Sequence, residues 1–403
     1  MPRDRALAWV LGLHGLAMMI AFPLGPQQAR LWHPGLPGIG ALVAAFPIAA
    51  VIAGLFARRL PRLPSKPRTL AFMAVAGLLT SIFSAGYFSF FAARILGGFT
   101  AGVSAVALYR VLPAQAIPAA TKVAGRIIAF GMPFCLLAAT VFDWRAVCIP
   151  ICAGFVIIAL RAARLAEFPS PTPARSLEEA APGALIATTA LAFVSSSYLT
   201  VLSGFLVGNA GHTEFHIPGG LLTGALLSLA VPSLMNFVNA RLAARTVFAG
   251  SLAAALLTLV CLLTLRGPLP AALVFAFIGC FLAANAMRHM ALARLIQPHL
   301  GADQVPAHQT HAYIAHCLGC GLGALCAGRV IHVRPMGGLY GMETLLGCAL
   351  VATTLALVAG FSVAQATASP AARPASAKSR WRVAASLVRS VRTSIIRNPG
   401  TPT

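Results

Sequence analysis

The sequence predicts an all-α, polytopic membrane protein with twelve transmembrane helices in two six-helix halves and both termini in the cytoplasm. Three observations support this prediction. Of the 403 residues, 59% are hydrophobic and only 9% are charged, more apolar surface than a soluble fold of this length could cover. The apolar residues form runs of about 20, the length of a membrane-crossing helix. The formal net charge is +22, and basic clusters occupy every second connection.

The apolar runs are continuous, which favours helices over the short alternating strands of a barrel. The first run follows Arg3 and Arg5 without a small-residue cleavage site behind it, so we expect a retained helix rather than a signal peptide. The twelve candidate spans lie near residues 6–26, 39–57, 69–87, 90–112, 123–142, 145–163, 184–207, 217–240, 246–265, 269–287, 309–329 and 343–363.

The basic residues predict the orientation of these spans. If both termini share one side, that side collects all but six of the 30 Lys and Arg, including the cluster from Arg58 to Arg68, and also Arg288 and Arg294. The positive-inside rule then places the termini in the cytoplasm and the protein in the inner (plasma) membrane. Loops that face anionic lipid explain the basic excess, so we expect no nucleic-acid partner. The other side holds or borders only Arg30, Arg94, Arg145, Arg266, Arg329 and Arg334.

Two halves of the chain resemble each other. The segment from Gly40 and the segment from Gly224 both begin Gly-Ala-Leu and continue with a proline, Pro47 or Pro232, and then Ala-Arg. Both segments fall on the second span of their half, which predicts a parallel two-fold repeat. A polar, proline-rich stretch separates the halves. We expect a six-helix bundle over residues 1–163, a cytoplasmic linker over 164–183, a second bundle over 184–363 and a basic cytoplasmic tail over 364–403.

Twelve helices in two halves, with local motifs in order, resemble the major facilitator superfamily. The loop after the second span, "GLFARRLPRL", resembles the family pattern G-x-L-A-D-R-x-G-R-K, although Arg58 replaces its acid. "RILGGFTAG" from Arg94 resembles the start of the family's fourth helix, "RIIAFGMPF" from Arg126 the Gly-Pro element of exporters, and "DWRA" from Asp143 the turn before the sixth helix. The resemblance implies a gating loop at Gly54, Arg58, Arg59 and Arg62, with a different latch because the acid is missing.

Ionisable residues within spans are the first candidates for solute binding or coupling. His14 lies in the middle of the first span; it binds solute, relays a proton or bonds to a neighbouring carbonyl. By the resemblance, the first helix faces the cavity of the fold. Arg94 lies near the outer start of the fourth span, where it contacts an anion, acts as a coupling switch as in the family's exporters, or extends to the headgroups. Arg126 is a further basic candidate.

The eleventh span begins with a run of histidines and cysteines, "HQTHAYIAHCLGC". A metal site is disfavoured because His311 and His316 are five residues apart, about 140° around a helix, and we expect His308 in the cytoplasmic loop. Gly319, Gly321 and Gly323 predict close helix packing, with the cysteines acting as further small residues. We therefore expect no metal and no disulfide framework, and His316 remains as a polar residue of the cavity.

Acidic residues are scarce, and none lies in the middle of a span. Proton-coupled carriers usually hold a membrane carboxylate, so coupling would fall to histidine, or the carrier is uncoupled. A cavity with Arg94, Arg126 and histidine but no acid is positive and favours anionic or zwitterionic solutes. Neutral polar candidates that add hydrogen bonds are Asn236, Asn285 and Tyr198.

The tail contains alternating 3- and 4-residue apolar steps over 380–397. This pattern predicts either a basic amphipathic helix on anionic lipid headgroups or a disordered basic segment.

These observations favour a secondary transporter that works by alternating access and exports a small organic anion or zwitterion. Uptake through the same fold, or a scaffold that no longer transports, are the alternatives. There is no G-x-x-x-x-G-K-[ST] loop, H-E-x-x-H motif, paired carboxylate or Ser/His/Asp set. We therefore expect neither an ATP-driven pump nor an enzyme, no cofactor, and a monomer whose partners are the solute and the bilayer.

Overall fold

Twelve α-helices make up most of the residues that the computed structural model describes, namely 3–22, 24, 36–60, 67–84, 86–162, 182–208, 216–264, 270–297, 300–301, 304–333 and 339–365. The first six are α1 (Arg3–Met19), α3 (Leu36–Arg59), α4 (Pro67–Ile82), α5 (Tyr87–Val111), α6 (Ile117–Val141) and α7 (Cys148–Ala162). The last six are α8 (Pro182–Gly208), α9 (His216–Asn239), α10 (Ala244–Thr264), α11 (Ala271–Ile296), α12 (Val305–Val333) and α13 (Leu339–Gln365). Two short 3₁₀ turns, η1 (Ala114–Ala116) and η2 (Trp144–Val147), precede α6 and α7.

The helices form a multi-pass membrane protein. On length and composition, eight of the described helices can cross a bilayer, and α4 is apolar but shorter. The eight are α3, α5, α6, α8, α9, α10, α11 and α13. Large apolar side chains point outward, and Phe83, Phe88 and Phe142 are 80%, 84% and 81% exposed. Hydrocarbon, rather than water, is the solvent that such a surface requires.

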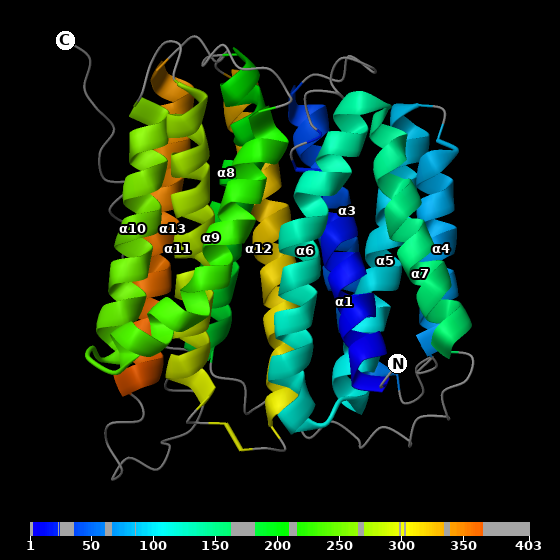
Figure 1. Cartoon of the computed structure of the whole chain (residues 1–403), viewed down its shortest axis with the longest axis horizontal. Coiled ribbons are helices and arrows are strands. Elements are labelled where there is room, and N and C mark those ends of the chain that lie inside the picture. The colour runs from blue at the N-terminus through cyan, green and yellow to red at the C-terminus, as the bar shows by residue number, and fades with distance from the viewer. Residues whose placement is uncertain are drawn as a thin grey trace, which may run out of the picture. The chain divides into compact units, whose positions relative to one another are not determined.

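The same helix pairings occur twice along the chain. In the first six helices α1 packs against α6 and α7, α3 against α5, and α4 against α5 and α7. In the last six α8 packs against α12, α9 against α11, and α10 against α11, while Gly360 of α13 lies against Phe248 of α10. Figure 1 shows the two sets side by side. The second helix of each set contains its proline, Pro47 in α3 and Pro232 in α9.

The predicted linker and tail lie almost entirely outside the described residues. Residues 163–181 and 366–403 are not among them, so the amphipathic helix predicted over 380–397 stays a prediction. The described part of the predicted linker is its end, where α8 already begins at Pro182.

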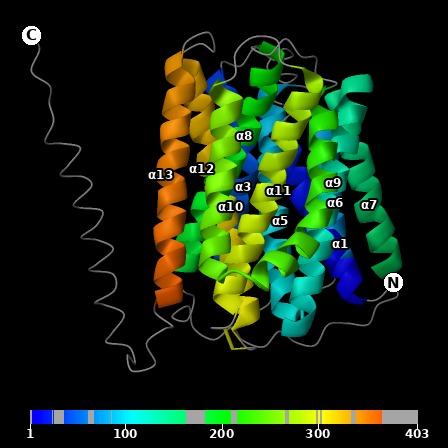
Figure 2. The same ribbon diagram turned by 60° about the vertical axis from the view of Figure 1, so that its left-hand side comes forward.

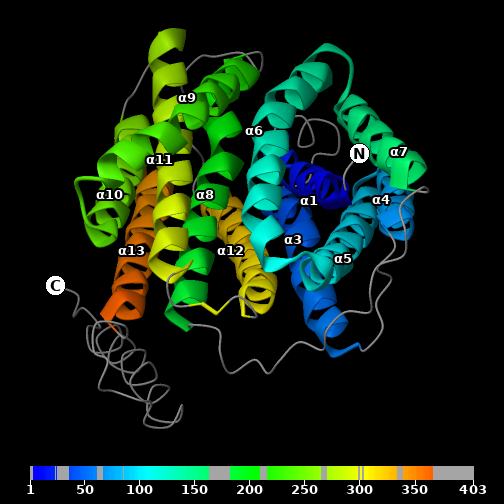
Figure 3. The ribbon, with the colours of Figure 1, turned by 60° about the horizontal axis from the view of Figure 1, so that its bottom comes forward.

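Contacts of α12 with α3 and with α5, and of α6 with α9, join the first six helices to the last six. Helix α3 packs against α12, and α6 against α9, as Figures 2 and 3 show from two directions. The contact of α3 with α12 runs from Gly40, next to Gly328, past Gly321, next to Ile48, to Gly54, next to Ile314. This α3–α12 seam therefore has close contacts at both ends and in the middle.

Small residues bring helices together within each half. A Cβ at Gly98 or Gly102 of α5 would collide with backbone carbonyls of α3. A Cβ at Gly319 or Gly323 of α12 would collide with carbonyls of α8. The prediction of close packing in the glycine-rich eleventh span is confirmed, and Cys317 and Cys320 are buried beside these glycines. The nine cysteines all belong to the described residues, and none of them is joined in a disulfide.

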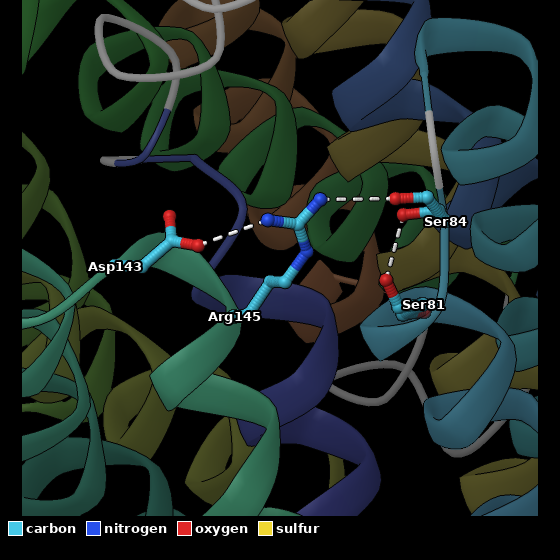
Figure 4. Close-up of polar contacts among 4 residues, drawn as sticks. All are labelled: Ser81, Ser84, Asp143 and Arg145. Carbon is cyan, nitrogen blue, oxygen red and sulfur yellow. Dashed lines mark hydrogen bonds and ion pairs between the residues drawn. The ribbon is translucent and has the colours of Figure 1, made fainter.

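Arginines occupy the carbonyl ends of two helices. Arg110 of α5 donates from Nη1 to the Leu60 carbonyl (3.0 Å) and from Nη2 to the Arg58 carbonyl (2.7 Å) at the end of α3. Arg145 of η2 donates to the Ser84 carbonyl just after α4 (3.1 Å) and pairs with Asp143 (3.1 Å). Figure 4 shows this cluster. The last carbonyls of a helix lack backbone partners and carry partial negative charge, so they attract cations.

Candidate functional site

Arg94, in the second turn of α5, points into the first six helices and is only 6% exposed. Its Nη1 donates to the Ala17 carbonyl (2.7 Å) and its Nη2 to the Met18 carbonyl (3.3 Å). Both carbonyls belong to the last turn of α1, so Arg94 also caps a helix end. Its Cζ lies 4.6 Å from the ring centroid of Phe46, and its Nε has no partner. The alternative in which this arginine extends to the headgroups is wrong because the side chain is buried.

A small cavity adjoins Arg94 in the interior of the first six helices. His14, Ala74, Thr100 and Phe155 are among the residues that line it, and the space open to the centre of a water molecule is about 20 Å³. That volume holds one or two waters. His14 is 4% exposed, its ring centroid lies 4.9 Å from that of Phe155 in α7, and its Nε2 has no partner. His14 therefore lies among the first six helices, not between the halves.

A second small cavity shares Arg94 and Ser81 with the first and extends to the start of α7, where Val147 and Cys148 line it. Arg94 therefore lines both cavities. Ser81 also joins the cluster of Figure 4, because its carbonyl accepts a hydrogen bond from Ser84 Oγ (2.7 Å). The Asp143–Arg145 pair thus lies close to the end of this cavity system.

Arg288 corrects one sequence-based prediction. The assignment of basic residues to the two sides of the membrane placed Arg288 in a cytoplasmic loop, after a span that ends at residue 287. Helix α11, however, continues to Ile296. The side chain is 1% exposed. Its Nε donates to Asn285 Oδ1 (2.8 Å), and its Nη2 donates to the Leu191 carbonyl (3.1 Å) and to Ser195 Oγ. Ser195 in turn donates to Asn285 Oδ1 (2.9 Å).

The two buried arginines lie on corresponding helices, although at different heights along them. Each lies on the fourth helix of its half, α5 or α11, and each donates to a carbonyl of the first helix, α1 or α8. Among the described residues, the carboxylates with placed side chains are Asp4 and Asp143, and neither bonds to Arg94 or Arg288. An unpaired charge in the interior is costly, and among the described residues only neutral groups, namely carbonyls and for Arg288 also Asn285 and Ser195, bond to these two guanidinium groups.

Two histidines lie near Arg288 and its partners Asn285 and Ser195. The ring centroids of His316 in α12 and His289 in α11 are 6.0 Å apart, and Cys320 Sγ lies 3.6 Å from His316 Nε2. Among the described residues, no three His, Cys, Asp or Glu side chains are arranged to hold a metal ion. Tyr198 is buried against Phe281, with 3.9 Å between ring centroids, and its hydroxyl has no partner.

The remaining candidates do not join these clusters. Arg126 and Asn236 are exposed. In the predicted gating loop, Gly54 packs against Ile314, Arg58 supplies a carbonyl to Arg110, and Arg59 is exposed; Arg62 lies outside the described residues. His308 is not in a loop as expected, because α12 begins at Val305 and buries this side chain to 6% exposure.

Sequence reasoning missed two arginines that the structure makes central, Arg288 and Arg110. Arg288 follows Asn285 by three residues, the spacing that puts two side chains on one helix face. That signal was available in the sequence. The partners of Arg110 at the end of α3 lie about 50 positions earlier in the chain, and no local pattern points to them.

Comparison with solved structures identifies the fold. The chain is similar to a variant of the nucleoside transporter NupG, with 14% identity, a TM-score of 0.58 and coverage of 90% of this chain and 99% of the other. It is also similar to a bacterial homologue of the human lysosomal transporter Spinster, in an inward-facing, unoccupied conformation, with 13% identity, a TM-score of 0.62 and coverage of 92% and 100%. Sequence comparison finds no matching protein family and no matching curated protein. Both similar structures are transporters, and the chain has their fold.

Proposed function

We propose that this protein is a secondary transporter that moves a small organic anion or zwitterion by alternating access between its six-helix halves. The observation that carries the proposal is Arg288, a guanidinium that is 1% exposed and that bonds only to neutral acceptors. Isolated charges of this kind inside a membrane protein usually have a functional reason. A carboxylate or phosphate of the solute supplies the negative charge that the described part of the chain does not provide at Arg288.

The neighbourhood of Arg288 is suited to binding such a group. A guanidinium presents donors in a planar fork that matches a carboxylate, while Ser195 and Asn285 hold its plane in position. His316 and His289 lie on the adjoining helix faces and offer further polar contacts. Helix α12 packs against both α8 and α3, so a ligand at this cluster would influence the seam between the halves.

We propose that the direction of transport is export from the cytoplasm across the inner membrane. This rests on the Gly131–Pro133 element, which lies inside α6 and resembles the element of exporters. Gly131 contacts Leu16 of α1, so the element lies at a close contact between the first and fifth helices. Uptake through the same fold is the alternative direction.

A counterflow assay in proteoliposomes tests the proposal. Organic anions, amino acids, nucleosides and drugs are offered with and without a pH gradient. We expect accumulation of an anionic or zwitterionic solute, a loss of at least tenfold in Arg288→Gln, and partial retention in Arg288→Lys. Lys122→Gln, an exposed cation at the start of α6, is the matched control and should transport normally.

Three outcomes would change the proposal. Folded protein with no flux for any solute favours a scaffold. Flux that survives collapse of the proton gradient excludes obligatory proton coupling. Normal flux in Arg288→Gln removes the arginine from the solute site.

A further inference from the structure

Two buried polar atoms without partners belong to the same cavity. Arg94 Nε and His14 Nε2 have no hydrogen-bond partner, and both residues are more than nine-tenths buried and line the cavity. An unpaired buried donor costs about 1–3 kcal/mol, and membrane interiors offer no bulk water to compensate. Two such atoms on one cavity point to a ligand that both of them contact.

The charge of the cavity points to an anion. The carbonyl end of α1 offsets about half an elementary charge of the Arg94 guanidinium, and Phe46 faces it on one side. Among the described residues that line the two cavities, the other ionisable groups are His14 on α1 and Cys148 on α7, and neither is a carboxylate. No carboxylate comes from the lining parts of α3, α4 or α5. A net positive charge therefore remains.

The size of the cavity limits the anion. Space of about 20 Å³ for the centre of a water-sized particle accepts one or two particles of that size, but not an organic solute of several atoms. A halide ion is only slightly larger than water. In the tautomer that carries its proton on Nε2, His14 donates to the same ion as Arg94 Nε–H.

We propose that this cavity is a binding site for a single chloride ion, held between Arg94 of α5 and His14 of α1. The ion is a resident ligand of the first six helices and is separate from the solute proposed at Arg288. By neutralising Arg94 and contacting α1 and α5 together, it stabilises the folded first half. Ligands that bind only the folded state raise its stability in proportion to their occupancy.

Thermal unfolding of the purified full-length protein in detergent tests this inference. Sodium chloride, sodium bromide and sodium gluconate are compared at constant ionic strength. We expect a saturable rise of several degrees with chloride and bromide and none with gluconate. Anomalous diffraction from a bromide-soaked crystal should show a peak within hydrogen-bonding distance of Arg94.

Three variants test whether the halide response of the unfolding temperature comes from this cavity. Arg94→Gln should lose the halide response, and Ala74→Leu should lose it too, because the longer side chain fills the cavity and leaves the guanidinium in place. Arg288→Gln, a buried arginine of the other half, should keep the halide response even where it abolishes transport. Equal unfolding temperatures in chloride and gluconate, or an unchanged response in both Arg94→Gln and Ala74→Leu, would overturn the proposal; in the first case water alone fills the cavity.

Discussion

A single methyl group at Gly40 should favour opening of one end of the seam between the halves. A Cβ built on Gly40 lies 2.9 Å from the Ala324 carbonyl oxygen and 2.9 Å from Gly328 Cα, both on α12. Ordinary contact begins at 3.4 Å, so in Gly40→Ala the helices must separate by about 0.5 Å. Neither atom can turn away, because both are backbone.

The unfavourable contact energy at residue 40 applies only while this end of the seam between α3 and α12 is closed. Overpacking of this kind costs about 1–3 kcal/mol, and a free-energy change of that size shifts an equilibrium between two states by about 5- to 150-fold. In a transporter that alternates between closed and open states of this end, Gly40→Ala should therefore populate the open state. Net transport should fall, because the cycle also requires the closed state.

Double electron–electron resonance between two spin labels can detect this shift toward the open state. Spin labels replace Phe88 of the first half and Leu257 of the second, both of them exposed, in a background without the native cysteines. We expect the longer-distance population to grow in Gly40→Ala. The matched control is Gly347→Ala on α13, where a Cβ meets nothing within 4 Å. If Gly40→Ala gives the distance distribution and the transport rate of the parent, the seam does not open here and our reasoning is wrong.

Three further predictions follow from contacts outside this seam. Arg110→Gln should lower the free energy of unfolding by about 1–2 kcal/mol, measured by thermal denaturation, because the end of α3 loses its cap; exposed Arg59→Gln should change it little. Mild oxidation should join Cys326 and Cys348, whose sulfurs are 3.9 Å apart on α12 and α13, and mass spectrometry of the digested protein should find that cross-link and no other major one. Tyr198→Phe should raise the unfolding temperature, because it removes a buried hydroxyl without a partner; a loss of transport together with a lower unfolding temperature would contradict this.

Most of the helices could be predicted because a membrane span leaves a continuous apolar run. Close packing could also be predicted where glycines recur, as at Gly98 and Gly319, since small residues let helices approach. Burial of Arg288 was missed, because a rule that ends a span at its first charge stops α11 at residue 287, whereas the helix continues to Ile296. The partners that hold Arg288, Leu191 and Ser195, are more than 90 positions away in the chain, and sequence patterns do not show such distant contacts.

The shortage of acidic residues has a structural counterpart in the first six helices. Arg94, Arg110 and Arg145 bond to the carbonyl ends of α1, α3 and α4 in turn. For Arg94 and Arg110 the helix ends thus take the place that carboxylates hold in other proteins, while Arg145 has Asp143 as well; each helix end contributes about 0.3–1 kcal/mol, and up to about 2 kcal/mol where partly buried. This also favours arginine over lysine, because one guanidinium can donate to two carbonyls at once, as Arg94 and Arg110 do.

Arg288 departs from this pattern, and that departure distinguishes it. Its carbonyl partner, Leu191, lies inside α8 rather than at an end, so no helix terminus offsets the charge. Its other partners, Asn285 and Ser195, are neutral. Of the four arginines, it is therefore the one whose burial is compensated least by the protein itself. A chain that provides a helix end for three of these cations and none for the fourth has the arrangement expected of a site that obtains its negative charge from the solute.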